Sequence, residues 1–315
     1  MDLGIIGLGK MGLNMSIRLI GDGHRVVGYD KNPAVVNTSV DYIPDVVGSI
    51  EALVDKLSTP RLIWVMVPSG EPIEQTFEQL TGVLSKGDII VDGGNCYYKD
   101  SMRRAGEADS KGIYYLDAGV SGGISGLRDG YSIMVGGDPE TFRQIEPILQ
   151  TLAFGKSSGY GLVGKSGAGH FVKMIHNGIE YGLMQAYAEG FELLSSKEDL
   201  SLDMLQVSGI WQNGSIISSR LLHFAQEILD QDPGLHANDG YVEDTGEGRW
   251  TVIESVELGV PIPVISSALQ RRFRSRQDQP YSDRFLAALR KVFGGHSVRH
   301  KVCLLYTSPS PRDRG

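Results

Sequence analysis

The segment 169-GHFVKMIHNGIEYG-182 concentrates side chains that can bind a ligand or move a proton. At about 100° per residue, as in an α-helix, its polar side chains share one stripe and its apolar side chains the opposite arc. Each glycine inside this helix costs about 1 kcal/mol relative to alanine, so a ligand or a neighbouring helix is expected to approach closely. From this segment alone, a functional site and a solvated helix face are equally good interpretations. The polar stripe holds Lys173, His176, Asn177, Glu180 and Tyr181, with Gly178 and Gly182 beside it.

An alternation of strand and helix patterns precedes this segment and would position it. Short apolar runs separated by helical patterns predict an α/β fold, an N-terminal Rossmann domain with a doubly wound, mostly parallel sheet over residues 1–163. The periodicity then becomes helical, which predicts a smaller all-helical C-terminal domain over residues 164–300. Strands are expected at 2–6, 24–30, 62–68, 88–94, 113–118 and 131–136, and the later helices at 202–211, 214–230, 250–258, 262–274 and 281–293.

The composition argues against some classes of partner. The chain of 315 residues carries a formal net charge of -8, which disfavours a nucleic-acid or membrane-surface partner. Cys96 and Cys303 fit neither a metal-site spacing nor a disulfide framework, so a cytoplasmic location is expected. The N-terminus lacks the pattern of a signal peptide. Residues 301–315 show no periodicity, and we predict that they are disordered or non-native.

The stretch 7-GLGKMG-12 matches G-x-G-x-x-G between a predicted strand and a predicted helix. In that setting the first glycine allows a tight turn, the second lets a pyrophosphate reach the backbone, and the third lets the helix approach the strand. An ordinary strand–helix turn is the alternative interpretation. The pattern predicts a dinucleotide site formed by Gly7, Leu8, Gly9, Lys10, Met11, Gly12 and Asp30. We expect Val67 and Asn95 to belong to the same site.

Asp30 ends the second predicted strand, 18 residues after Gly12. A carboxylate at this position accepts hydrogen bonds from ribose hydroxyls and repels a 2′-phosphate, which predicts NAD in preference to NADP. The adjacent Lys31 would soften that preference.

Two further glycine-rich segments, 92-DGGNCYYKDS-101 and 117-DAGVSGGISGLRDG-130, follow predicted strands. In this order with 169–182, they make residues 1 to about 300 resemble the decarboxylating 6-phosphogluconate dehydrogenases. The likeness is to the short, NAD-preferring branch of this group within the β-hydroxyacid dehydrogenase superfamily. It implies oxidative decarboxylation of 6-phospho-D-gluconate to ribulose 5-phosphate and CO2 with reduction of NAD, in the pentose phosphate pathway and gluconate utilisation. The resemblance implies no metal.

The same resemblance implies roles for individual side chains. Lys173 resembles the general base that takes a proton from the substrate's C3 hydroxyl, and Glu180 the acid that later protonates C1. To act as a base Lys173 must be partly neutral, so burial and neighbouring positive charge should lower its pKa. The residues that resemble substrate contacts are Asn95, Ser121, Gly122, Gly123, His176, Asn177 and Tyr181.

The phosphate end of the substrate and a partner subunit are implied in the same way. Arg272 resembles a phosphate-binding arginine, with a solvated basic helix as the alternative. The segment 290-RKVFGGH-296 resembles one whose arginine and histidine enter a neighbouring subunit's site. Arg290 and His296 would therefore act in trans, in a homodimer or homotetramer.

The loop 244-DTGEGRWT-251 departs from the resemblance. Arg249 stands where a lysine is expected, and Thr245 stands at the place of a second lysine just upstream. Part of the phosphate site is therefore in doubt. Four acidic residues lie in or near this loop, and without regular ligand spacing we interpret them as a solvated loop rather than a metal site. They are Asp239, Glu243, Asp244 and Glu247.

Two other functions compete with this one. A 3-hydroxyisobutyrate-type dehydrogenase would share the glycine loop, the S-G-G segment and the lysine, but would not decarboxylate. It would lack the Asn95 motif and the acid at Glu180. A nucleotide-binding regulatory protein without turnover is the second alternative, and the presence of both Lys173 and Glu180 argues against it.

Overall fold

A computed structural model describes residues 1–295 and 297. The chain divides into two compact units. The first holds Met1–Asn238 and Asp244–Leu269, and the second holds Asp239–Glu243 and the chain from Gln270 onward. The predicted tail, residues 301–315, lies outside the described residues. The boundary at 163/164 that the sequence suggested stays a prediction.

One eight-stranded sheet organises the first 164 residues, in the order β3-β2-β1-β4-β5-β6-β7-β8. Every neighbouring pair is parallel except β6 with β7, which is antiparallel. On β1, Gly4 pairs with Val27 on one side and Ile63 on the other. The prediction of a mostly parallel α/β sheet is thus confirmed. The strands are β1 (Asp2–Ile6), β2 (Arg25–Tyr29), β3 (Asp45–Val46), β4 (Leu62–Val65), β5 (Ile89–Asp92), β6 (Tyr114–Ser121), β7 (Ser132–Gly136) and β8 (Tyr160–Gly164).

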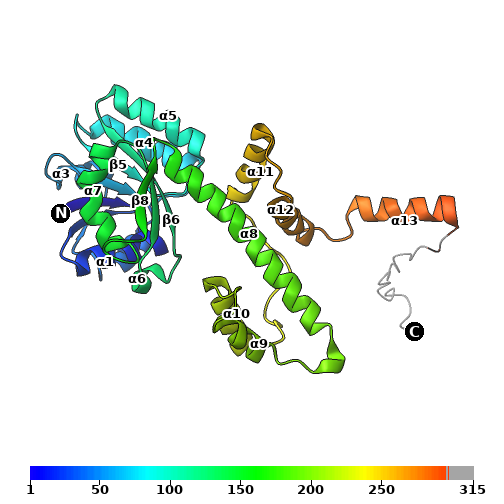
Figure 1. Ribbon diagram of the computed structural model, residues 1–315. Helices are drawn as coiled ribbons and strands as arrows, with labels where there is room; N and C mark the ends of the chain where they lie inside the picture. The colour runs from blue at the N-terminus through cyan, green and yellow to red at the C-terminus, as the bar shows by residue number, and fades with distance from the viewer. Residues whose placement is uncertain (296, 298–315) are drawn as a thin grey trace, which may run out of the picture. The chain divides into compact units, whose positions relative to one another are not determined.

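Helices cover both faces of this sheet (Figure 1). Successive side chains of a strand point to opposite faces. Accordingly Ile5 belongs to one apolar cluster, with Met15 and Leu19 of α1, while Ile6 belongs to another, with Phe77 of α4. Buried residues on both sides of the strands confirm the doubly wound arrangement. These helices are α1 (Lys10–Gly21), α2 (Pro33–Ser39), α3 (Ile50–Asp55), α4 (Glu71–Val83), α5 (Tyr98–Ser110), α6 (Gly126–Asp129) and α7 (Pro139–Leu152).

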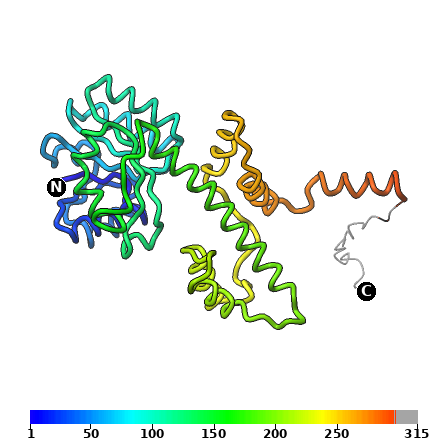
Figure 2. Tube along the Cα trace, viewed as in Figure 1, coloured from blue at the N-terminus to red at the C-terminus, as the bar shows by residue number. Residues whose placement is uncertain are grey.

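The rest of the described chain is helical, as predicted, and Figure 2 traces it from green to orange-red. The helix expected at 214–230 begins later, because Gly214 has a φ of 93° and the Ser219 side chain caps the helix by accepting from the Leu222 N–H. None of the described helices has the length and apolar character needed to cross a membrane. The helices are α8 (Ala168–Ser195), the 3-10 turn η1 (Glu198–Leu200), α9 (Met204–Gln212), α10 (Arg220–Gln231), α11 (Glu247–Leu258), α12 (Pro263–Ser275) and α13 (Tyr281–Gly294).

Several short elements were not expected from the sequence. β3 has two residues and α6 has four, too few for a periodic pattern. β8 carries glycine at both positions 161 and 164 within its five residues, which weakens its strand signal. α3 has only six residues.

Candidate active site

The carboxyl ends of β1, β2 and β4 border a cavity of about 470 Å³. The strand order reverses here, since β1 has β2 on one side and β4 on the other, and open α/β sheets bind ligands at such a point. Of the residues predicted to bind the cofactor, Leu8 and Asn95 are not in the lining. The others line it: Gly7, Gly9, Lys10, Met11, Gly12, Asp30 and Val67.

The glycine loop leaves room for a dinucleotide where side chains would obstruct it. An added Cβ at Gly9 would meet no atom within 4 Å, so this residue borders open space. At Gly12 it would lie 1.9 Å from the Gly7 carbonyl oxygen, so only glycine lets α1 begin this close to the turn. α1 starts at Lys10 without a side-chain cap, which leaves its first N–H groups available to a pyrophosphate. The loop therefore fits a bound dinucleotide.

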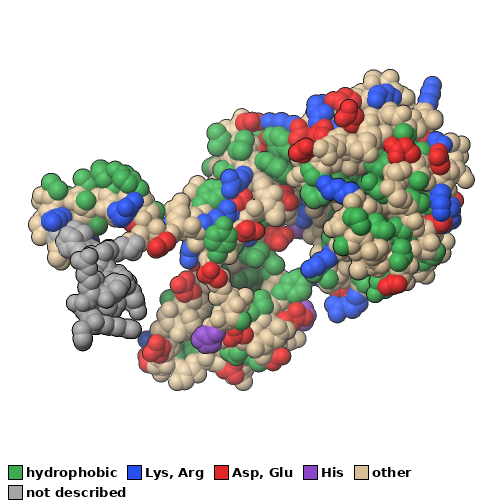
Figure 3. All heavy atoms as spheres, turned by 180° about the vertical axis from the view of Figure 1, so that it is seen from behind, with side chains coloured by type: hydrophobic (Ala, Val, Ile, Leu, Met, Phe, Trp, Pro, Cys, Tyr) green, Lys and Arg blue, Asp and Glu red, His purple; other side chains and the backbone are tan. Residues whose placement is uncertain are grey.

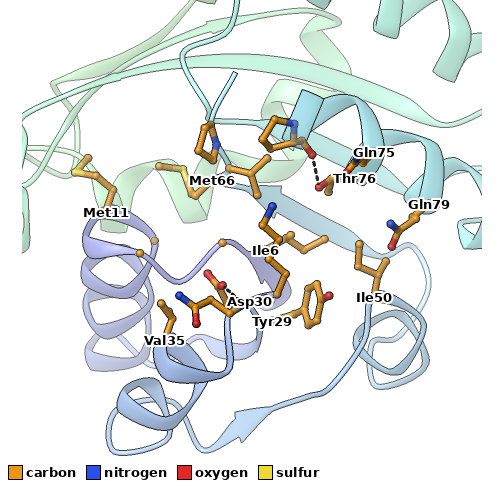
Figure 4. Close-up of a pocket in the computed structure, with 18 of the residues that line it drawn as sticks. Ile6, Met11, Tyr29, Asp30, Val35, Ile50, Met66, Gln75, Thr76 and Gln79 are labelled. Carbon is orange, nitrogen blue, oxygen red and sulfur yellow. Dashed lines mark hydrogen bonds between the residues drawn. The ribbon is translucent and has the colours of Figure 1, made fainter. Parts of the chain in front are cut away.

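Asp30 lies directly after β2, between the glycine loop and α2 (Figure 4). Its Oδ2 accepts from the Leu8 N–H at 2.8 Å, and its Oδ1 accepts from the Asn32 N–H at 2.8 Å. Each carboxylate oxygen keeps a further lone pair for a ribose hydroxyl. These bonds hold a negative charge at the cavity wall, where it disfavours a second anion such as a 2′-phosphate.

Asn95 lies in the turn after β5 and has a φ of 53°. Its Oδ1 accepts from the Val120 N–H at 2.9 Å, and its Nδ2 donates to the Val120 carbonyl oxygen at 3.3 Å. The amide therefore ties the end of β5 to the end of β6, one residue before Ser121.

A buried polar cluster anchors this turn from below. Asp92 accepts from the Gly94 N–H at 3.0 Å, from the Tyr115 hydroxyl at 2.6 Å and from Arg104 Nη2 at 3.0 Å. Burial alone would raise the pKa of Asp92, but the charges of His170 and Arg104 and the Tyr115 hydrogen bond lower it. The carboxylate is thus ionised and paired inside the protein, which fixes the backbone that leads to Asn95.

α8 begins in direct contact with the sheet. The buried Asp117 carboxylate on β6 accepts from the Gly167 N–H at 2.6 Å and from the His170 N–H at 2.8 Å, satisfying two donors of the first turn. An added Cβ at Gly119 would lie only 2.3 Å from the Lys173 Cβ. A glycine in β6 and a carboxylate cap therefore set where Lys173 stands relative to the sheet.

The polar stripe of α8 meets the end of β6. Lys173 Nζ donates to Asn177 Oδ1 at 2.6 Å. His176 lies with Nδ1 3.2 Å from Asn177 Oδ1 and 3.4 Å from Lys173 Nζ, and with Nε2 3.4 Å from the Ser121 hydroxyl. Nδ1 also lies 3.7 Å from Glu180 Oε2. One contiguous cluster thus contains five of the predicted site residues, and Asn95 adjoins it through Val120.

The electrostatics of this cluster suit proton transfer. Lys173 is 5% exposed, and burial lowers the pKa of its ammonium against the opposing charges of Glu180 and Glu247. The expected direction of the pKa shift is confirmed, with burial as its cause. The expectation of a neighbouring positive charge is wrong, because the charges that act on Lys173 are those of two carboxylates. Burial also lowers the pKa of His176, and the Lys173 charge adds to the effect. Both groups are therefore easier to deprotonate than in water.

The two glycines of the stripe admit neighbouring helices. An added Cβ at Gly178 would lie 2.8 Å from the Thr251 methyl on α11, and at Gly182 it would lie 3.3 Å from Val264 on α12. The alternative between a ligand and a helix is thereby resolved for the described structure. The apolar arc of α8, in contrast, stays exposed, with Ile179 at 51% and Leu183 at 48%.

The remaining predicted substrate residues border this region. Tyr181 is 6% exposed, and its hydroxyl accepts from the Thr245 N–H at 3.4 Å. Gly122 and Gly123 follow Ser121 with φ values of 131° and 57°, backbone conformations that favour glycine.

The interpretation of 244–247 as a solvated loop is wrong for two of its acids. The Asp244 side chain is 2% exposed and pairs with Arg249 at 2.6 Å, and Glu247 is 9% exposed. α11 begins at Glu247, three residues earlier than predicted, and its first turn folds against Tyr181. Within residues 1–295 and 297, no group of three or more His, Cys, Asp or Glu side chains is arranged to hold a metal ion.

The predicted phosphate and trans residues belong to the second unit. Arg272 donates from Nη1 to the Glu243 carbonyl oxygen at 2.7 Å, within that unit. Arg290 lies on α13 and is exposed. His296 lies outside the described residues. The roles of all three stay predictions.

Two family models match the chain. Residues 2–161 match the NAD binding domain of 6-phosphogluconate dehydrogenase, and residues 169–288 match the C-terminal domain of 6-phosphogluconate dehydrogenase. The chain belongs to the 6-phosphogluconate dehydrogenase family. The join between the two matches coincides with the start of α8, where Lys173 meets β6.

Relatives of two lengths illustrate the family. The chain is 42% identical to a Haloferax volcanii protein named NAD(+)-dependent, decarboxylating 6-phosphogluconate dehydrogenase, covering 96% of this chain and 99% of the relative. It is 38% identical to the decarboxylating 6-phosphogluconate dehydrogenase of Chlamydia pneumoniae, covering 87% of this chain but 60% of the relative. Among solved structures, Plasmodium falciparum 6-phosphogluconate dehydrogenase aligns with a TM-score of 0.81 at 28% identity, over 96% of this chain and 67% of that one.

The sequence did not predict the residues whose hydrogen bonds fix the backbone around the active site. Asp92 and Asp117 stand at or near strand ends, inside the D-G-G-N and D-A-G-V-S-G-G segments. That position is the signal by which they could have been found. Arg104 carries no such signal in the sequence, because an arginine on a helix is normally solvated.

Proposed function

We propose that this protein catalyses the oxidative decarboxylation of 6-phospho-D-gluconate to ribulose 5-phosphate and CO2, with reduction of NAD. The observation that carries the proposal is the cluster of Lys173, His176, Asn177 and Ser121 at the end of β6. It adjoins, through Asn95, the sheet edge that holds the dinucleotide cavity. Lys173 as the proton acceptor and the bound nicotinamide as the hydride acceptor can therefore both act at C3 of the substrate.

NAD is the preferred cofactor, and the glycine loop and Asp30 would hold it. When bound, its nicotinamide ring accepts the two electrons and the hydrogen that leave C3 of the substrate. Lys31 also lines the cavity and is exposed. Its cation favours phosphate groups in general, so we expect NADP to be used slowly rather than refused.

The proposed reaction has three stages, namely oxidation at C3, loss of CO2 and protonation of C1, and residues of the chain act in them. Neutral Lys173 takes the proton of the C3 hydroxyl as C3 is oxidised, which burial of its amine favours. The resulting 3-keto acid loses CO2, because the new carbonyl accepts the electron pair of the breaking bond. Lys173, now an ammonium, stabilises the enolate oxygen. Glu180, one helical turn from His176, then supplies the proton to C1 of the product.

Substrate orientation falls to the polar groups around Lys173. His176 and Asn177 contact the Lys173 amine, and the Ser121 hydroxyl contacts the His176 imidazole. This set of groups is suited to a carboxylate and neighbouring hydroxyls. Gly122 and Gly123 leave the backbone beyond Ser121 open to a ligand. Tyr181 would be a further substrate contact. The planar fork of a guanidinium suits a phosphate, which is the role that we propose for Arg272.

A single assay tests the reaction. Purified protein with 6-phosphogluconate and NAD should form NADH and CO2 in equal amounts. A 3-hydroxyisobutyrate-type dehydrogenase would instead form NADH from 3-hydroxyisobutyrate and release no CO2. A nucleotide-binding regulatory protein would bind NAD without turnover. Absence of NADH formation with 6-phosphogluconate would refute the proposal.

We further propose a homodimer or homotetramer in the cytoplasm. None of the α13 residues is buried within one chain, and its apolar stripe is exposed: Phe285 50%, Leu289 43%, Val292 85% and Phe293 78% (Figure 3). Exposed apolar faces of this kind mark contacts with another chain. The apolar arc of α8 is exposed as well. A second copy of the chain would cover such faces and bring Arg290 and His296 to a neighbouring site.

Subunit complementation tests the shared site. Lys173→Ala and Arg290→Ala subunits should each be nearly inactive alone. In a mixed dimer one site carries both changes and the other carries neither, so activity should return on co-refolding. A mixture no more active than its parents would contradict a site shared between subunits.

A further inference from the structure

α11 brings to the site an acid that the proposed steps do not use. Glu247 is 9% exposed, and the Thr245 hydroxyl donates to its Oε2. Within residues 1–295 and 297, no lysine, arginine or histidine forms an ion pair with this carboxylate. Glu254, two turns later on the same helix and 7% exposed, differs in this respect, because Tyr98 donates to it and Lys99 Nζ lies 3.7 Å away.

The placement of Glu247 follows from how α11 crosses α8. The Thr251 hydroxyl donates to the Met174 carbonyl oxygen at 2.9 Å, directly after Lys173. An added Cβ at Gly248 would lie 2.5 Å from the Tyr181 ring. The first turn of α11 therefore lies against the part of α8 that carries Lys173 and Tyr181, and Glu247 occupies that turn.

Few charged groups face Lys173 from the surrounding elements. Its own helix contributes His176 and Glu180, and α11 contributes Glu247. β6 contributes the Gly119 backbone and the Ser121 hydroxyl. Near the start of α8, the Asp117 carboxylate accepts hydrogen bonds from the Gly167 and His170 N–H groups. The Ser101 hydroxyl of α5 is hydrogen-bonded to the His170 ring.

We propose that Glu247 is a positioning residue of the active site: its buried carboxylate stabilises the ammonium form of Lys173 and so sets the balance between base and acid. The inference deepens the proposed function and rests on it, since Lys173 must be neutral before oxidation and charged during decarboxylation. The proton moves from the C3 oxygen to Lys173 Nζ, and no bond to Glu247 forms or breaks. Burial lowers the pKa of Lys173 and the Glu247 charge opposes that effect, which makes the amine a stronger base than burial alone would leave it.

The direction of the effect of Glu247→Gln follows from this balance. Without the carboxylate the pKa of Lys173 falls further, so more of the amine is neutral at a given acidic pH. The acid limb of kcat/KM should move to lower pH. The plateau of kcat should fall severalfold, because the weaker base takes up the C3 proton less readily.

Competitive labelling of lysines with acetic anhydride provides a readout that needs no turnover. Only neutral amines react, so the pH dependence of Lys173 labelling, relative to the exposed Lys156, reports its protonation. Glu247→Gln should increase Lys173 labelling severalfold at acidic pH. Glu247→Asp, which keeps the charge, should restore most of the original profile. Glu254→Gln is the matched control and should leave the labelling profile of Lys173 unchanged.

Each outcome decides between alternatives. If the labelling profile and the acid limb of Glu247→Gln coincide with those of the unchanged protein, the inference is overturned. Equal shifts in Glu247→Gln and Glu254→Gln would also overturn it, because a general disturbance of α11 would then explain both. Failure of the unchanged protein to turn over 6-phosphogluconate refutes the proposed function instead, while the labelling result still stands.

Discussion

Gly119→Ala should separate the position of Lys173 from the stability of the fold. The added Cβ would lie 2.3 Å from the Lys173 Cβ and 2.7 Å from the Gly169 carbonyl oxygen. Ordinary contacts between carbon atoms are about 3.5–4.0 Å, so α8 or β6 must shift by roughly 1 Å or more. A misplacement of about 1 Å at a reacting group costs on the order of 100-fold in rate. Overpacking of this kind costs about 1–3 kcal/mol of stability, which leaves a folded protein.

The measurements are kcat, KM for both substrates and thermal unfolding of the variant. We expect kcat to fall about 100-fold, while the affinity for NAD stays near its original value because the glycine loop lies elsewhere on the sheet. Gly161→Ala on β8 is the matched control, since an added Cβ there meets nothing within 4 Å. A Gly119→Ala protein that keeps kcat within about threefold would refute the argument that β6 positions the lysine.

Four further predictions follow from individual contacts. Asp30→Ala should raise kcat/KM for NADP relative to NAD about tenfold or more, because repulsion between unit charges near 4 Å amounts to about 1–4 kcal/mol. An unchanged ratio in kinetics with both cofactors would contradict this prediction. Arg104→Met should lower the free energy of unfolding by about 3–5 kcal/mol, because Asp92 stays buried without its cation; urea denaturation showing a loss below about 1 kcal/mol would disagree. Phe285→Asp should reduce the mass seen by light scattering, and an unchanged mass would argue against α13 as an interface. For the unchanged protein, kcat/KM should rise with pH through the lowered pKa of Lys173, because only the neutral amine accepts a proton. A profile that levels off only at the pKa of free lysine, about 10.4, would show that burial does not lower this pKa.

The fold was predictable from the sequence where local pattern and position agreed. The apolar runs that became β1, β4 and β5 are buried on both faces, and such runs cannot be mistaken for half-exposed strands. The glycine loop and Asp30 were predictable for a related reason, because the chemistry of a turn between a strand and a helix is local.

The stripe of α8 was predictable as a stripe, but the burial of Lys173 and Tyr181 within it was not. Helical spacing grouped Lys173 with Tyr181, and only the structure shows that β6 and α11 cover that side. The apolar arc with Ile179 and Leu183 is the exposed one in a single chain. The physical reason is tertiary: the glycines allow closer contact than leucine does, so the small-residue face meets the sheet and the neighbouring helix.

The support behind the site was not predictable from spacing. Asp92 and Arg104 are twelve residues apart and Asp117 caps a helix fifty residues later, so each pairing depends on how strands and helices come together. Glu247 was misread for the same reason, since a run of acidic residues is normally solvated. Pairings between distant parts of the chain leave no periodic signal.

Lys173 is the centre of the proposed mechanism, and its removal is the most direct test. Lys173→Ala should bind NAD as the unchanged protein does and lose on the order of 100- to 10,000-fold in kcat with 6-phosphogluconate, the usual contribution of a general base. Retention of most of the turnover, with NADH and CO2 still formed in equal amounts, would contradict the assignment of this lysine as the base.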